Sequence, residues 1–190
     1  MDIFERIASY RAENERMAWA GTFKEYIELL RKDPSPAKTA HARVYDMIKS
    51  HGVEDNNGRK RYKFFEQEIF GLDRAVEKLV EEYFHSAARR LDVRKRILLL
   101  MGPVSGGKST LVTLLKRGLE RYSRTEQGAV YGIEGCPMHE DPLHLIPLEL
   151  RPDIEKELGV RIEGNLCPSC QMRLKNDYSG TIEKVKVVRV

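Results

Sequence analysis

Apolar residues in the first fifty positions recur every three or four residues, which is the spacing of one face of a helix. The first predicted helix carries this stripe at Ile3, Phe4, Ile7 and Tyr10. A second begins after Thr22, because Thr22 and Glu25 have the spacing of a capping box. A third covers residues 37–50, and Gly52 can terminate it. We therefore expect a helical N-terminal region over residues 1–61.

The segment EDNNGRKR, residues 54–61, interrupts the helical pattern with polar and turn-forming residues. Asn57-Gly58 within it is typical of a short turn. We place the domain boundary here, between residues 1–61 and 62–190. Beyond the boundary, a helix starting at Asp73 has one apolar face, formed by Val76, Leu79, Val80, Tyr83, Phe84 and Ala87.

The second half of the chain alternates between strand and helix patterns. Residues 97–101 are a continuous apolar run, as in a strand that helices cover on both faces of a parallel sheet. Helical periodicity returns over residues 108–122, with inward positions at Leu111, Leu114, Leu115 and Leu119. Further elements are expected as strands at 129–133, 160–162 and 184–190 and a helix at 152–158. A strand, a glycine-rich turn and a helix in succession predict an α/β fold, a parallel sheet with flanking helices.

The glycine-rich turn matches the P-loop (Walker A) pattern G-x-x-x-x-G-K-[ST] at every position. The matching residues are Gly102, Pro103, Val104, Ser105, Gly106, Gly107, Lys108 and Ser109. Such a turn points successive backbone N–H groups, and the positive end of the following helix, at polyphosphate oxygens. Lys108 would reach the β- and γ-phosphates, Ser109 would coordinate Mg²⁺, and Thr110 would lie near the α-phosphate. A flexible strand-to-helix loop matching by chance is the structural alternative.

The segment IFGLDRAVEKLVEEYF, residues 69–84, resembles the lead-in of AAA+ ATPases, which lies over the adenine. That resemblance implies that Phe70 and Gly71 lie near the base. The alternative is a capping glycine followed by a packing helix.

Three longer segments resemble the N-terminal AAA+ module of the PrkA-type serine protein kinases. They are HARVYDMIKSHGVED, GCPMHEDPLHLIP and the stretch from FGLDRAVEK to LLKRGLE, residues 70–120. The resemblance covers nearly the whole chain and implies an ATP-binding AAA+ core, incomplete here, that serves phosphorylation of protein serines. It also implies a protein substrate and a ring-shaped homo-oligomer for full-length members, which continue well past this point.

The catalytic residues are not assignable from the sequence. After Ser109 no run of four apolar residues ends in Asp-Glu, so the acid that would orient the attacking water is not found. No G-x-G-x-x-G-x-V, H-R-D or D-F-G set is present, which argues against a eukaryotic-type kinase. Kinase activity therefore rests on the resemblance alone. An AAA+ motor for protein remodelling or ATP-dependent proteolysis is the second hypothesis.

Two short hooks, Cys136-x-x-His139 and Cys167-x-x-Cys170, contain all three cysteines of the chain. Three thiolates and one imidazole can form a tetrahedral zinc site, although 27 residues separate the hooks, longer than usual in a zinc ribbon. His144 is a spare ligand. The alternative is a proline-shaped loop with reduced thiols. A zinc-stabilised binding module without catalysis is thus the third functional hypothesis.

Composition and charge indicate where in the cell the protein is expected and which partners it is expected to lack. A chain with 41% hydrophobic and 33% charged residues is ordinary for a soluble protein, and no apolar run is long enough to span a membrane. The N-terminus does not have the pattern of a signal peptide, and three cysteines do not suggest a disulfide framework, so we expect a cytoplasmic protein. The basic run at residues 89–96 is interpreted as a solvated helix end, and neither nucleic acid nor membrane is expected as a partner.

Overall fold

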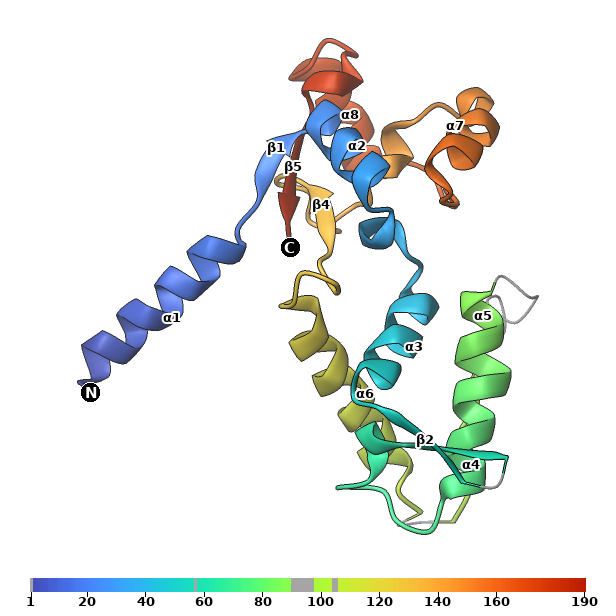
Figure 1. The fold of residues 1–190 in the computed structure, drawn as a ribbon. Helices are drawn as coiled ribbons and strands as arrows, with labels where there is room; N and C mark the ends of the chain where they lie inside the picture. Colours follow the sequence, from blue (N-terminus) through green and yellow to red (C-terminus); the bar gives the residue numbers. More distant parts are fainter. Residues whose placement is uncertain (1, 57, 90–97, 104–105) are drawn as a thin grey trace. The chain divides into compact units, whose positions relative to one another are not determined.

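The computed structural model describes residues 2–56, 58–89, 98–103 and 106–190 (Figure 1). The chain forms two compact units, Met1–Ala37 with Ala129–Val190, and Lys38–Gly128. The expected division between residues 61 and 62 does not coincide with these units and stays a prediction about domains. Ile97 of the predicted strand, the P-loop residues Val104 and Ser105, and residues 90–96 of the predicted basic run lie outside the described residues.

The first unit contains a small antiparallel sheet with helices around it. Its strands are β1 (Ala20–Thr22), β4 (Tyr131–Ile133) and β5 (Lys186–Arg189), in the order β1-β5-β4. The central strand pairs Val187 with Gly21 on one side and with Ile133 on the other. The helices are α1 (Ile3–Met17), α2 (Phe23–Lys32), α7 (Arg151–Leu158) and α8 (Pro168–Asn176).

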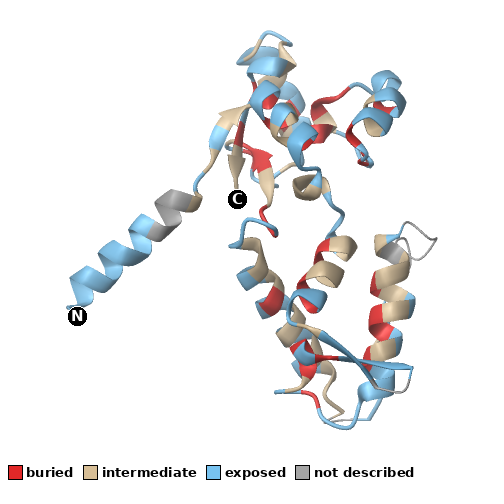
Figure 2. Ribbon diagram, viewed as in Figure 1, coloured by how far each residue is buried: buried red, intermediate tan, exposed pale blue. Residues whose placement is uncertain are grey.

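Helix α2 has both a capped N-terminus and a buried apolar face, as its sequence predicts. The predicted capping box is confirmed: Thr22 Oγ1 accepts from the N–H of Glu25 at 3.3 Å, and the Glu25 carboxylate accepts from the N–H of Thr22 at 2.7 Å. The apolar face then buries Phe23, Tyr26 and Leu30 against the sheet residues and the C-terminal segments. Helix α1 is also confirmed as a helix, but its apolar stripe is exposed rather than packed, as Figure 2 shows.

The second unit contains helices packed against one another and a β-hairpin. Its elements are α3 (Ala40–Ser50), β2 (Val53–Asn56), β3 (Arg59–Tyr62), α4 (Asp73–Lys78), a π-helical segment η3 (Leu79–His85), α5 (Ser86–Ala88) and α6 (Lys108–Ser123). The hairpin turns at the predicted position, with Gly58 at φ 78°. The core gathers Met47, Ile48, Tyr62, Phe64, Phe65, Ile69, Val76, Leu79, Val80 and Phe84.

Several predicted elements are confirmed and others are not. The helices at 108–122 and 152–158 and the strands near 131–133 and 186–189 are present. The strand expected at 160–162 is wrong, although Val160 and Ile162 are buried, because an irregular segment carries them into the core. The single helix expected after Asp73 contains the wider π-helical segment in its middle.

The predicted parallel sheet is not confirmed. Residues 98–101 lie in no strand, and the side chains of Leu99 and Met101 are 72% and 82% exposed. An apolar strand is buried only when neighbouring strands and helices cover it, and the strand pairs among the described residues are all antiparallel. The part of the chain that the structure describes is therefore mixed α/β, with two small sheets. Among the described residues, no helix combines the length and the apolar character that crossing a membrane requires.

Candidate functional site

The glycine loop, residues 102–110, leads into α6 in the second unit; Val104 and Ser105 lie outside the described residues. Gly106 donates its N–H to the carbonyl oxygen of Pro103 at 3.2 Å, which closes a tight turn. A Cβ on Gly106 would lie only 3.0 Å from that oxygen. Gly107, the N-cap residue of α6, has φ 72°, in the left-handed region that favours glycine. The curled backbone thus depends on glycine at both positions.

Lys108 lies over the curl of the glycine loop. Its Nζ donates hydrogen bonds to the carbonyl oxygens of Gly102, at 2.9 Å, and of Pro103. Ser109 and Thr110, in the first turn of α6, are exposed. The first N–H groups of a helix have no partner within it, and they carry the positive end of the helix dipole. The loop therefore presents an ammonium group, a hydroxyl and a helix N-terminus together.

An apolar pocket of about 360 Å³ adjoins the glycine loop within the same unit. Gly106, Gly107 and Lys108 form its polar edge. Its apolar lining comes from the segment before α4, from α4 and the first residue of η3, from residues 99–101 and from α6, namely Ile69, Leu72, Ala75, Val76, Leu79, Leu99, Leu100, Met101 and Leu111. The pocket thus places a cavity with apolar walls directly beside the cationic loop.

The residues expected next to the base are placed differently from the prediction. Phe70 is 77% exposed, and neither Phe70 nor Gly71 lines the apolar pocket. Their neighbours Ile69 and Leu72 do line it. The sequence could not separate these positions, because an apolar residue on either side of a turn glycine has the same pattern whether it packs in the core or faces a cavity.

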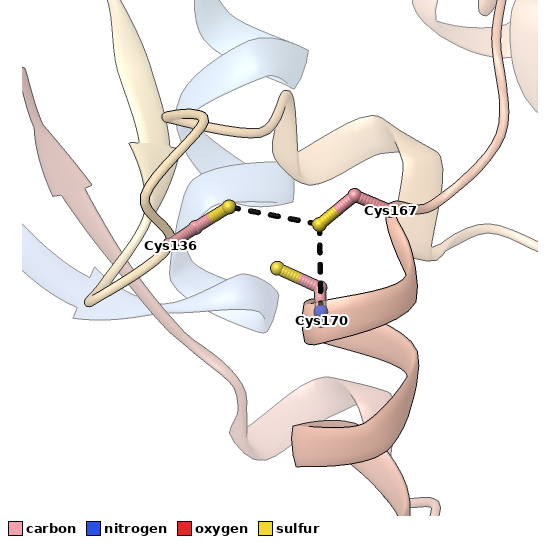
Figure 3. A group of neighbouring side chains, drawn as sticks. All are labelled: Cys136, Cys167 and Cys170. Atoms are coloured by element: carbon pink, nitrogen blue, oxygen red, sulfur yellow. Dashed lines mark hydrogen bonds between the residues drawn. The ribbon is translucent and has the colours of Figure 1, made fainter.

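The two cysteine hooks meet in the first unit (Figure 3). The Sγ atoms of Cys136, Cys167 and Cys170 all lie within 4.8 Å of one another, and those of Cys136 and Cys167 are 3.8 Å apart. We call these three residues the thiol cluster. The expected fourth ligand, His139, is exposed and does not belong to this group. His144 is engaged elsewhere, with Glu140 and with the carbonyl oxygen of Glu163.

Local structure orients each thiol toward the cluster. Cys136 follows β4, and Cys167 is the N-cap of α8, where its Sγ accepts from the N–H of Cys170 at 3.4 Å. Glu140, the residue after His139 of the first hook, is linked to the second hook because its carboxylate accepts from the N–H of Cys167 at 3.1 Å. The same carboxylate contacts His144. Both Cys136 and Cys170 are buried.

Burial and hydrogen bonds act in opposite directions on these thiols. Burial alone would raise the pKa of Cys136, but hydrogen bonds with the backbone of Glu140 and Met138 and with the thiols of Cys170 and Cys167 together outweigh it and lower that pKa. Burial and the neighbouring sulfur atoms raise the pKa of Cys170. Burial also opposes ionisation of Glu140, but contacts with His144 and Cys167 outweigh it and lower the pKa of that carboxyl.

Known proteins resemble this chain along its whole length. The family model described as the PrkA AAA domain matches residues 21–190. A Bacillus subtilis (strain 168) protein named "ATP-dependent protease PrkA" is 61% identical over 190 residues, which are 100% of this chain and 30% of that protein. "Serine/threonine kinase YeaG" of Escherichia coli (strain K12) is 30% identical over 187 residues, 89% of this chain and 28% of that protein.

A shorter Geobacillus stearothermophilus protein, described as uncharacterized, is 64% identical over 97 residues, which are 51% of this chain and 100% of that protein. The chain thus spans less than a third of the named Bacillus and Escherichia relatives. No solved structure matches it significantly.

Proposed function

This chain belongs to the PrkA AAA domain family, and we propose that it binds Mg-ATP through the glycine loop in support of the phosphorylation of protein serines. The observation that carries the proposal is the position of Lys108, whose ammonium group is held over a backbone curl that needs glycine at positions 106 and 107. An AAA domain implies nucleotide binding, and these residues fit a nucleotide's phosphates.

The glycine loop offers each type of contact that a triphosphate requires. Lys108 would exchange the carbonyl oxygens of Gly102 and Pro103 for phosphate oxygens, which carry full negative charge and make stronger hydrogen bonds. Ser109 is exposed and would place its hydroxyl in the coordination shell of Mg²⁺. The N-terminus of α6 favours anions by its dipole. Bound Mg-ATP would supply a transferable γ-phosphoryl group.

The apolar pocket is the proposed site of the adenine ring. Its volume of about 360 Å³ lies within the range of small-molecule sites, and its walls are formed by Leu72, Val76, Met101 and their apolar neighbours. Ile69 and Leu72 replace Phe70 and Gly71 in this assignment, because they line the pocket. In the whole protein we expect residues 97–101 to join a parallel sheet, which would cover the exposed Leu99 and Met101.

Transfer of a labelled γ-phosphoryl group tests the kinase proposal. The whole protein, incubated with labelled ATP, Mg²⁺ and a mixed protein substrate, is expected to yield phosphoserine identified by mass spectrometry. Lys108→Ala should abolish the label, whereas Lys116→Ala, which changes an exposed lysine of the same helix, should retain it. Equal labelling by the Lys108→Ala variant would contradict a role for the glycine loop.

ATP-dependent proteolysis is the second candidate, favoured by the printed name of the 61% identical Bacillus relative. The same glycine loop would serve it, since a protein-remodelling motor also binds Mg-ATP. The two candidates separate when degradation of an unfolded protein is followed beside label transfer. Fragments that accumulate only with hydrolysable ATP, without phosphoserine, would favour proteolysis; phosphoserine on intact substrate would favour the kinase.

A further inference from the structure

We propose that Cys136, Cys167 and Cys170 bind a zinc ion that ties the loop after β4 to the N-terminus of α8. The three cysteines belong to the first unit, whereas the glycine loop belongs to the second. It involves every cysteine of the chain and rests on the geometry of the thiol cluster.

The sulfur separations suit a shared tetrahedral metal. With Zn–S bonds of about 2.3 Å, two thiolates on a tetrahedral zinc ion lie roughly 3.8 Å apart. The Sγ atoms of Cys136 and Cys167 are 3.8 Å apart, and all three lie within 4.8 Å of one another. The third sulfur, on Cys170, thus lies no more than about 1 Å beyond that spacing. Thiolate ligands in this arrangement select zinc over hard cations such as Mg²⁺ and Ca²⁺.

A disulfide explains the cluster less well. An S–S bond needs the sulfur atoms about 2.05 Å apart, which is much shorter than the 3.8 Å between Cys136 and Cys167. A disulfide would also leave the third cysteine unused inside the same pocket. A metal ion uses all three sulfurs, and Figure 3 shows them converging from two separate segments.

The surrounding backbone is arranged to stabilise sulfur that carries negative charge. Cys167 accepts from the N–H of Cys170 at the start of α8, where the helix dipole also favours an anion. The N–H donor directed at this sulfur neutralises part of the charge that three thiolates bring to one zinc ion.

Side chains outside the thiol cluster hold the loop after β4 against the start of α8. Glu140 accepts from the N–H of Cys167, so the loop after β4 is joined to the start of α8. Arg173 of α8 donates to the carbonyl oxygen of Glu134, on the other side of Cys136. Cys136 and Cys167 are 31 positions apart in the sequence, and these contacts keep the thiols together before any metal binds.

The fourth coordination position is not supplied by the thiol cluster. His139 follows Cys136 by three residues but stands outside the group of converging atoms. We therefore assign the site a three-thiolate core with a water molecule at the fourth position, and we expect His139 to be dispensable for metal binding.

Metal content of the full chain, purified without chelators from zinc-supplemented cells, tests the proposal. We expect one zinc ion per chain and three thiols that become reactive to a thiol reagent only after removal of the metal with a chelator. Replacement by Co²⁺ should give a sulfur-to-cobalt charge-transfer band. These measurements use the unaltered protein, so they do not depend on whether a variant folds.

Variants then assign the ligands. Cys136→Ser, Cys167→Ser and Cys170→Ser should each lose the zinc, whereas His139→Ala and the exposed-site control Met172→Ser should retain it. Circular dichroism of each variant identifies any that fail to fold. A metal-free wild-type chain with three reactive thiols, or a Cys136–Cys167 disulfide found by mass spectrometry, would overturn the proposal. Retention of zinc by all three cysteine variants would overturn it as well.

Discussion

Gly118 in α6 lies against the ring of Phe64, so closely that a Cβ on Gly118 would come within 2.6 Å of the ring atoms. The same Cβ would lie 2.9 Å from the Sδ atom of Met47 in α3. The missing side chain is therefore what allows α6 to approach the core of the second unit. A glycine within a helix otherwise costs stability, about 1 kcal/mol relative to alanine.

Gly118→Ala is expected to destabilise the protein even though alanine is the better helix former. The added methyl group must displace Phe64 or Met47, and overpacking of a core costs about 1–3 kcal/mol. Urea denaturation measures the difference. Thr113→Ala, at an exposed position of the same helix, serves as the control and should change stability by no more than about 0.5 kcal/mol. A Gly118→Ala variant as stable as the control would show that the core is loosely packed there.

Glu81 should make the second unit sensitive to acid. Its carboxylate accepts from the hydroxyl of Tyr62 and pairs with Lys60 at 2.9 Å and His85 at 3.2 Å. Burial acts to raise the pKa of Glu81, but the hydrogen bonds from Tyr62 and Lys60 outweigh it, so the pKa is lowered. A carboxyl with a lowered pKa in the folded state stabilises the fold above its unfolded pKa of about 4.3 and loses that contribution as the pH falls through the folded pKa.

Denaturation curves recorded from neutral to acidic pH test this dependence. Stability should fall on acidification, and Glu81→Gln should flatten the fall. Glu82→Gln, which changes an exposed carboxyl next to it, should leave the profile unaltered. If the free energy of unfolding of Glu81→Gln falls with pH as steeply as that of the wild type, Glu81 does not cause the loss of stability in acid.

Arg151→Lys should destabilise the first unit. The Arg151 side chain is buried and donates to the carbonyl oxygens of Ile146 at 3.0 Å and Gly164 at 2.7 Å. Lysine has no planar fork and cannot reach both acceptors in this geometry, so at least one buried carbonyl group loses its partner, at about 1–3 kcal/mol. Thermal unfolding provides the measurement. Arg161→Lys, the same substitution at an exposed arginine, is the control, and equal effects of the two variants would contradict the argument.

Local signals in the sequence predict the elements that short-range chemistry determines. The capping box at Thr22 and Glu25, the glycine turn before Gly107 and Lys108, and the hairpin turn at Gly58 depend on residues within a few positions of one another. The same holds for α6, whose leucines repeat at helical spacing.

Long-range packing determines what the sequence alone did not reveal. The exposed stripe of α1 has the same periodicity as a packed helix. The irregular but buried segment at Val160 and Ile162 has the same apolar alternation as a strand. The two cysteine hooks were recognisable by spacing, but only the fold determines that three sulfurs meet and that His139 stands apart.

Calorimetric titration of the full chain with Mg-ATP tests the central claim most directly. We predict that the wild type binds and that Lys108→Ala weakens binding by about 10- to 100-fold, because a hydrogen bond to a charged group contributes about 1.5–3 kcal/mol. Lys116→Ala should bind as the wild type does. Affinity that is unchanged in the Lys108→Ala variant, or no binding by a folded wild-type chain, would contradict the assignment of the glycine loop as the nucleotide site.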